Sequence, residues 1–446
     1  MRYPQSVLFL VACLLTACSN SGSSSNTKTS PDNAVTPREW LPVGGTATIP
    51  LDSSLPFLQF IPDLDILAYP EASLGRELFV AEWEVAPSTR ETLDGFGPLA
   101  ITNACDTCHL SNGRAASLLS DGTIGPGLLF RLGTIDGQHD TYLGNQVQTF
   151  AAAGQAEGSI RWQADVQSGG VGFTFIPTTT ALEPGINLGP RLSPQLAGIG
   201  LLDLVSDDDI LAWADSDDAD NNGISGRVHW RQNQIGRFGW KAIHTSLRNQ
   251  SAGALQGDMG LTTTINPTEP CTAMQTVCDD QPNGGDPEVS DHALDAINAF
   301  LTLLAVPDRR FTDADAFDAG ADVFDKIGCA DCHRPTLKTG VSEQFSVLSG
   351  QTIYPYTDLL LHDMGPALSD GVKEGDANPA EWRTPPLWTL GLIENTEGAR
   401  FLHDGRAANL QEAIEWHGGE ATNAKQAFDS LTEDERADLM LFLRSI

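Results

Sequence analysis

The chain has 446 residues, more than one typical domain holds, and 41% of them are hydrophobic, as in a folded globular protein. Its 26 Lys and Arg stand against 59 Asp and Glu, which gives a formal net charge of −33. This charge opposes attraction to nucleic acid or to an anionic membrane surface. It is typical of a well-solvated surface, and it permits a cationic partner protein.

The first residues are typical of an exported lipoprotein. Arg2 precedes an apolar run from Val7 to Leu15, which is too short to span a bilayer and fits a signal peptide. The Thr-Ala-Cys18 sequence that follows resembles a bacterial lipobox. The resemblance implies cleavage after residue 17, lipid on Cys18 and, with Ser19 next, an outer-membrane location facing the periplasm. An ordinary signal peptide is the alternative.

The segment after the leader is predicted to be a flexible tether. Residues 18–55 begin with a stretch rich in Ser, Asn, Thr and Gly, a composition that does not favour a packed core. No later segment has the pattern of a transmembrane helix. The chain is therefore expected to reach the membrane through its lipid anchor only.

Most of the chemical information lies in the eight cysteines. Four of them form two Cys-x-x-Cys-His motifs, made of Cys105, Cys108 and His109, and of Cys329, Cys332 and His333. This is the signature of c-type haem attachment. On one helical turn, positions i, i+3 and i+4 share a face, so both thiols can bond the haem vinyl groups while the imidazole reaches the iron. The sequence therefore predicts two covalent haems.

Other uses of these cysteines fit less well. A zinc site needs four ligands in one place, and a thioredoxin-like redox pair does not need the histidine. The remaining pair, Cys271 and Cys278, lies in a polar loop and is predicted to form a disulfide in an oxidising compartment. Two free thiols are the alternative for that pair.

The sequence also contains a diverged internal repeat. Residues 72–79 and 316–324 each read as an amphipathic helix with Gly and Phe at matching offsets before a haem motif. The second copy is expected to open with a helix around 291–304 and to close with a helix that starts at a capping box of Thr432 and Glu435. The apolar face of that last helix comprises Leu439, Phe442, Leu443 and Ile446.

We therefore expect a mainly α fold with two cytochrome c-like modules, the first carrying a large loop-rich insertion with minor β structure. The predicted divisions are a signal peptide over residues 1–17, a tether over 18–55, an N-terminal haem domain with its insertion over 56–290, and a C-terminal cytochrome c domain over 291–446.

Several further motifs resemble a known family. The segment 401–414 resembles the C-terminal module of bacterial di-haem cytochrome c peroxidases and MauG-type enzymes. The closer resemblance is to the di-haem oxidoreductases labelled peroxidases or thiol oxidoreductases, carried by residues 223–227, 236–242, 356–365, 381–388 and 416–421. It covers most of residues 60–446 and implies peroxidase-like redox chemistry. The thiol label finds no support, because every cysteine is accounted for without a catalytic thiol pair.

For the C-terminal haem, the resemblance implies two axial ligands. His333 supplies one side, and the position fourteen residues after His403, which holds the second ligand in the peroxidases, is His417. Two imidazoles would give a low-spin iron at a lower potential than a His/Met pair. Met364 is the alternative ligand, and His403 is expected to form a hydrogen bond near the haem.

For the N-terminal haem, His109 supplies one side. The peroxidases use a Gln and a Glu about ten residues apart on the other side, and Gln146, Gln148 and Glu157 have that spacing here. Glu157 is the candidate general acid and base, because a carboxyl group beside peroxide can move a proton between the two oxygens. A surface carboxylate in a loop is the plain alternative. The Phe-Trp-Asp-Gly-Arg segment of the peroxidases is absent.

One acidic turn suggests calcium. Asp218, Asp220 and Asn222 alternate ahead of Gly223, which suits Ca²⁺, although the twelfth position is His229 where an EF-hand has Glu. An Asx-rich turn without metal is the alternative.

Together these patterns predict a periplasm-facing di-haem oxidoreductase. It would reduce H₂O₂ at the N-terminal haem with electrons that a redox protein delivers through the bis-His C-terminal haem. The alternatives are a pure electron-transfer cytochrome, with both irons six-coordinate, and MauG-like oxidation of a protein or peptide partner.

Overall fold

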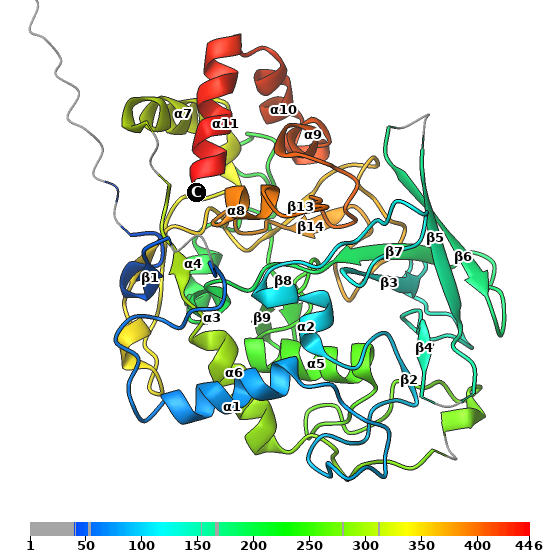
Figure 1. The fold of residues 1–446 in the computed structure, drawn as a ribbon. Helices are drawn as coiled ribbons and strands as arrows, with labels where there is room; N and C mark the ends of the chain where they lie inside the picture. Colours follow the sequence, from blue (N-terminus) through cyan, green and yellow to red (C-terminus); the bar gives the residue numbers. More distant parts are fainter. Residues whose placement is uncertain are drawn as a thin grey trace, which may run out of the picture. The chain divides into compact units, whose positions relative to one another are not determined.

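The computed structural model describes residues 40, 42–51, 55–152, 154–165, 169–278, 281–310 and 313–446. The predicted signal peptide, Cys18 and most of the tether lie outside the described residues. Trp40–Ile446 cluster as a single unit (Figure 1). Among the described helices, none is both long and apolar enough to cross a membrane.

Short helices and small sheets build this unit. The helices are α1 (Tyr69–Val80), α2 (Cys105–Cys108), α3 (Ile199–Asp203), α4 (Asp207–Leu211), α5 (Leu247–Met259), α6 (Asp291–Thr302), α7 (Ala314–Lys326), α8 (Leu390–Glu394), α9 (Leu410–Glu415), α10 (Thr422–Asp429) and α11 (Glu433–Ser445).

Each described sheet has two strands, and this mixed content is compatible with the expected helical fold with minor β structure. The parallel pair is β1 (Thr48–Ile49) with β10 (Val306–Pro307). The antiparallel pairs are β2 (Leu99–Ala100) with β4 (Phe150–Ala151), β3 (Leu128–Gly133) with β7 (Asn187–Leu192), β5 (Gly158–Ala164) with β6 (Val171–Pro177), β8 (His229–Arg231) with β9 (Gln234–Gly236), β11 (Leu337–Lys338) with β12 (Thr352–Ile353), and β13 (Leu361–Asp363) with β14 (Glu381–Arg383).

Two helix pairs each cross at a glycine. Helix α1 packs on α6, and α7 packs on α11 (Figure 1). A Cβ on Gly75 would overlap the carbonyl oxygen of Ala296, and a Cβ on Gly320 would overlap that of Asp438. Glycine at these two positions therefore allows the backbones to touch.

The phenylalanines of the repeat pack in the same way in both pairs. Phe79 meets Phe300 of α6, and Phe324 meets Phe442 of α11, each with ring centroids 5.3 Å apart and an interplanar angle of 56°. The Gly and Phe offsets in the sequence thus correspond to a repeated helix crossing.

The structure corrects the place of one predicted helix. Residues 291–302 form α6 as expected, but the expectation that this helix opens the C-terminal module is wrong. It packs on α1 and α5, and its apolar residues Leu294, Ile297 and Phe300 belong to a first core, to which the described helices α7 and α11 contribute no residue. The sequence pattern showed an apolar face without showing which helix that face would cover.

The closing helix matches its prediction. Helix α11 begins at the capping box of Thr432 and Glu435. The four residues of its predicted apolar face are buried in a second core with α7, together with Met440. Strands β3 and β7 carry a third core, in which Phe130 and Leu132 are buried while Arg131 points to the other face of the strand.

Candidate haem sites

The first Cys-x-x-Cys-His motif forms one turn of helix. Cys105 and Cys108 begin and end α2, and His109 follows directly. His109 Nδ1 lies 2.9 Å from the carbonyl oxygen of Pro194, so Nδ1 carries the proton and Nε2 is left free. Burial lowers the pKa of His109 to about 4. The imidazole is therefore neutral, as a ligand to iron must be.

These three residues line a cavity of about 220 Å³, counted as space open to the centre of a water molecule. One buried water needs about 10–15 Å³ on this measure, so the cavity is far larger than a packing defect. Much of its wall is apolar and comes from α1, α5 and α6, including Phe79, Leu247, Leu255, Ile297 and Leu301.

The polar part of the wall is basic although the chain is acidic. Two carboxylates line it, those of Asp258 and Glu374, and Arg191 and Arg237 also pair with Asp370 and Asp207 outside the wall. The cationic side chains that line it are those of Arg114, Arg131, Arg191, Arg237, Lys241 and Arg383. A haem brings two carboxylates of its own, an apolar ring and an iron that needs an imidazole. Paired thiols, a free imidazole nitrogen, apolar walls and basic groups fit that cofactor.

The second motif repeats the geometry of the first. Cys329 begins a 3₁₀ turn (Cys329–Asp331), and His333 Nδ1 lies 3.0 Å from the carbonyl oxygen of Tyr356. Nε2 is again the free nitrogen. Burial, and then the nearby His417, lower the pKa of His333 to about 4.

His417 lies near enough to His333 to be, after burial, the next cause that lowers the pKa of His333. His417 Nδ1 lies 2.8 Å from the carbonyl oxygen of Ala413, so its Nε2 is also free. The alternative ligand, Met364, lies beside Gly418, since its carbonyl oxygen is 3.2 Å from the position of a Cβ there. The ligand assignment itself stays a prediction.

A buried histidine that sequence reasoning did not single out contacts the second motif. His362 Nε2 lies 2.9 Å from Asp358 Oδ2, and its Nδ1 lies 2.7 Å from Glu420 Oε2 and 3.7 Å from Cys332 Sγ. Burial alone would lower the pKa of His362, but hydrogen bonds to Asp358, Cys332 and Glu420 raise it well above its usual value. The imidazole is therefore a cation beside the cysteine. The i, i+4 spacing of Asp358 and His362 was a visible signal.

His403 contacts the wall of the first cavity, because its carbonyl oxygen accepts from the backbone N–H of Leu192 and its ring lies 6.4 Å from that of Trp240. Its ring stacks on Trp382 with centroids 3.6 Å apart, and Lys241 Nζ lies 3.7 Å from the same Trp382 ring. Burial, then Arg191, lower the pKa of His403 well below its usual value. Its Nε2 has no hydrogen-bond partner in the described part of the chain, and the expected hydrogen bond near a haem stays a prediction.

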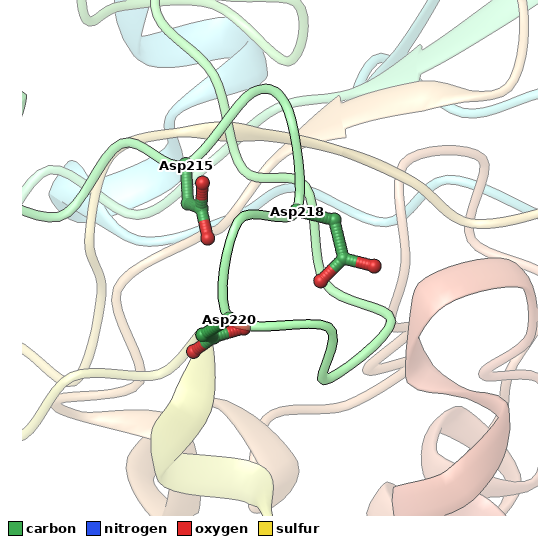
Figure 2. A group of neighbouring side chains, drawn as sticks. All are labelled: Asp215, Asp218 and Asp220. Carbon is green, nitrogen blue, oxygen red and sulfur yellow. The ribbon is translucent and has the colours of Figure 1, made fainter.

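The group of carboxylates at the acidic turn differs from the set predicted to bind calcium. Asp215, Asp218 and Asp220 place one carboxylate oxygen each within 4.8 Å of one another (Figure 2). Asn222 instead donates to Asp220 over 3.0 Å and accepts from the backbone N–H of Ile224. Asp215 thus takes the place expected for Asn222, and calcium binding stays a prediction.

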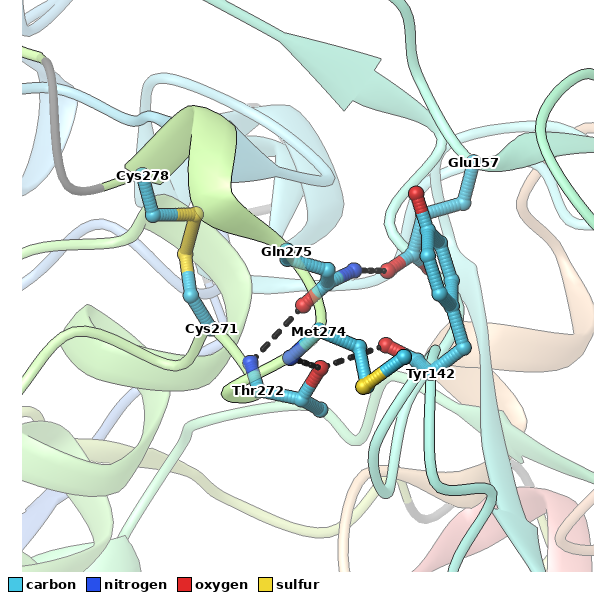
Figure 3. The surroundings of a disulfide bond; sticks show 7 residues. All are labelled: Tyr142, Glu157, Cys271, Thr272, Met274, Gln275 and Cys278. Atoms are coloured by element: carbon cyan, nitrogen blue, oxygen red, sulfur yellow. Dashed lines mark hydrogen bonds between the residues drawn. A yellow bond between two sulfur atoms is a disulfide. The ribbon is translucent and has the colours of Figure 1, made fainter.

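The predicted disulfide joins Cys271 and Cys278 (Figure 3). The loop it closes covers Glu157, which accepts from Gln275 Nε2 over 2.5 Å and from the backbone N–H of Gln148 over 2.6 Å. Burial raises the pKa of Glu157 to about 7. The carboxyl group is therefore enclosed between the loop and β5.

The three residues predicted beside the first haem lie together, but behind its wall. Of the described residues that line the cavity, none is Gln146, Gln148 or Glu157. Gln146 Nε2 donates to Asp258 Oδ1 over 2.9 Å, and Asp258 does line the cavity. The proposed acid and base role of Glu157 thus has no support from its position.

Two sites, each suited to a haem, define a di-haem protein. Residues 176–446 match the family described as "Di-haem oxidoreductase, putative peroxidase", and the chain belongs to this family. It is therefore a haem oxidoreductase. The second motif lies within the matched residues and the first precedes them.

No curated protein matches the chain significantly. Among solved structures, xenon-pressurised hydrazine synthase of Kuenenia stuttgartiensis is similar over 95% of this chain and 100% of its own, with 14% identity and a TM-score of 0.39.

Proposed function

We propose that the protein is a periplasm-facing c-type cytochrome with two covalent haems that reduces hydrogen peroxide at the first site. The observation that carries this proposal is an asymmetry. The first motif opens on a cavity with a polar, basic wall, whereas a second imidazole, that of His417, lies close to the second motif. An iron with a free coordination position can bind peroxide, whereas a six-coordinate iron is suited to electron transfer.

In this proposal each haem motif and its helix pair form one cytochrome c-like module. Cys105 and Cys108 would hold the first haem, and Cys329 and Cys332 the second. The first haem, when bound, supplies the redox centre at which peroxide reacts. A reduced redox protein supplies two electrons through the second haem, and with two protons they convert H₂O₂ into two molecules of water.

The chain's own residues prepare the first site. The Pro194 carbonyl fixes the proton of His109 on Nδ1 and so keeps Nε2 available. The apolar residues of α5 and α6 exclude water, and the basic side chains of the wall offer partners for the haem carboxylates.

Low-temperature EPR of the oxidised, haem-loaded protein tests this asymmetry. We expect one high-spin signal that cyanide converts and one low-spin signal that cyanide leaves unchanged. Two low-spin signals that ignore cyanide, before and after one-electron reduction, would indicate a pure electron carrier. Absence of peroxide turnover above free haem with several reduced donors would contradict the peroxidase proposal.

The anchor and the calcium site belong to the same proposal. Replacing Cys18 by Ala should move the protein from the membrane fraction to the soluble fraction.

If Ca²⁺ binds at Asp215, Asp218 and Asp220, a hundredfold excess over its Kd should stabilise the fold by about 2.7 kcal/mol. The same addition to Asp218→Asn should then have no effect on the melting temperature.

A further inference from the structure

The wall of the first cavity carries a histidine and an arginine to which sequence reasoning gave no role. His244 lies between the 236–242 motif and α5, and Arg131 lies on β3. Both side chains line the cavity that begins at the first haem motif. The strand alternation that buries Phe130 and Leu132 in a separate core turns Arg131 toward this cavity.

Glycines leave room for the imidazole of His244. A Cβ on Gly253, in the middle of α5, would lie 2.5 Å from His244 Cε1. On another side of the ring, a Cβ on Gly239 would lie 3.9 Å from Cδ2. Within the described chain, no hydrogen bond joins this imidazole to another residue. The ring is held by packing, and its nitrogens are left for a ligand.

Arg131 reaches the same wall one helical turn along α5. Its Nη1 lies 4.0 Å from the position of a Cβ on Gly257, four residues after the glycine that faces His244. The neighbouring Asp258 is held by Gln146. Burial, then Arg131, lower the pKa of His244 to about 4. The wall thus presents an unprotonated imidazole near a guanidinium cation.

We propose that His244 and Arg131 are the proton-transfer pair of this cavity, an inference that rests on the proposed peroxide reduction. His244 accepts a proton from one oxygen of H₂O₂ and donates it to the other as the O–O bond breaks and water leaves. Arg131 stabilises the negative charge on the departing oxygen. Two electrons from the redox protein and two protons from solvent complete the reduction to a second water molecule.

The test uses the full-length, haem-loaded protein with His244→Leu, and with His292→Leu as a control at an exposed histidine. Hydrogen cyanide must lose a proton on binding, so its association rate reports the proton acceptor without turnover. We expect His244→Leu to lower both that rate and kcat/KM for peroxide by about 100-fold or more, with the high-spin EPR signal intact. The control should match the wild type.

A pair of glycine variants tests the geometry without removing the histidine. Gly253→Ala places a methyl group against the His244 ring, whereas Gly257→Ala meets its nearest atom, Gln146 Nε2, at an ordinary 3.7 Å. Both changes favour the helix. We expect Gly253→Ala to slow cyanide association about tenfold and Gly257→Ala to leave it unchanged.

Three results would overturn the inference. The first is rates for His244→Leu within the error of the wild type. The second is a low-spin signal that becomes high-spin in that variant, which would make His244 an iron ligand. The third is a wild type that binds no cyanide in either the oxidised or the half-reduced form. If His244→Leu slows cyanide association but the wild type shows no peroxide turnover in either form, the proposed function is refuted. His244 would then still be the proton acceptor of the cavity.

Discussion

The two haem sites share an attachment motif, a helix crossing and a histidine whose Nδ1 faces a backbone carbonyl. They differ in what lies around these shared parts. The first opens on a cavity with basic side chains, and the second has a nearby imidazole, His417, and a charged histidine, His362, against its cysteine. The motif therefore selects the cofactor, while residues distant in sequence select what the cofactor can do.

The difference also has a cause in the chain. The residues between α2 and α6 form most of the wall of the first cavity, with β3, β7 and α5 among them. The second motif is also followed by a long segment before α11, which includes β11 to β14 and α8 to α10, and this segment brings His362 and His417 to the motif. The segment that follows the haem motif thus lines a cavity at the first site and brings two histidines to the second.

The largest expected effect comes from removing one attachment motif. The double variant Cys105→Ser, Cys108→Ser should halve the covalent haem content and abolish peroxide turnover, because the cavity then lacks its cofactor. A pyridine haemochrome assay of denatured protein measures the haem content. The matched control, Cys271→Ser with Cys278→Ser, removes the disulfide and should retain both haems. Equal haem loss in both double variants would contradict the assignment.

The next effect concerns the second site. His417→Ala should convert the low-spin signal of the second haem to a high-spin signal that cyanide changes, so that the two sites become alike. Met364→Leu, beside Gly418, is the matched control and should leave the low-spin signal in place. If Met364→Leu alone opens the iron, then Met364 is the ligand and the bis-His assignment fails.

Glu157 gives a pH-dependent prediction. Burial raises the pKa of Glu157 to about 7, so the folded protein binds this proton more tightly than the unfolded chain does. The free energy of unfolding then falls as pH rises from about 4.5 to 7, by up to about 3 kcal/mol from this group. Urea denaturation at pH 5 and pH 8 measures the fall. It should be smaller in Glu157→Gln, and an equal fall in both proteins would show that Glu157 does not contribute.

Local patterns predicted much of the fold and of the cofactor chemistry. The spacing within Cys-x-x-Cys-His, the capping box of Thr432 and the Gly and Phe offsets of the repeat act within a few turns, so they can be recognised in sequence. The helix on which α6 packs could not be recognised in this way. The sequence shows that α6 has an apolar face but not which neighbour covers that face.

The wall of the first cavity could not be predicted in this way. Arg131, Lys241 and His244 come from a strand and a turn far from the first motif, and only the fold brings them to it. For Glu157, by contrast, the sequence predicted a position beside the first haem that the structure does not show. Its spacing from Gln148 matched the peroxidases, and the two residues do contact each other, but they lie behind the wall. Spacing along a chain does not determine which side of a strand faces a cavity.

The smallest expected effect tests how alike the two helix crossings are. Gly75→Ala and Gly320→Ala each place a methyl group on a backbone carbonyl of the partner helix, so each should destabilise the fold by about 1–3 kcal/mol. Gly257→Ala is the control, because its methyl group meets no atom closer than 3.7 Å and should stabilise α5 by up to about 1 kcal/mol.

Urea denaturation of the three variants measures these changes. Similar losses for the first two would mean that both helix pairs depend on one kind of crossing, although the two haem motifs have different surroundings. A loss at Gly320 with none at Gly75 would mean that the first helix pair accommodates the added methyl group, so that its crossing is looser than that of the second pair.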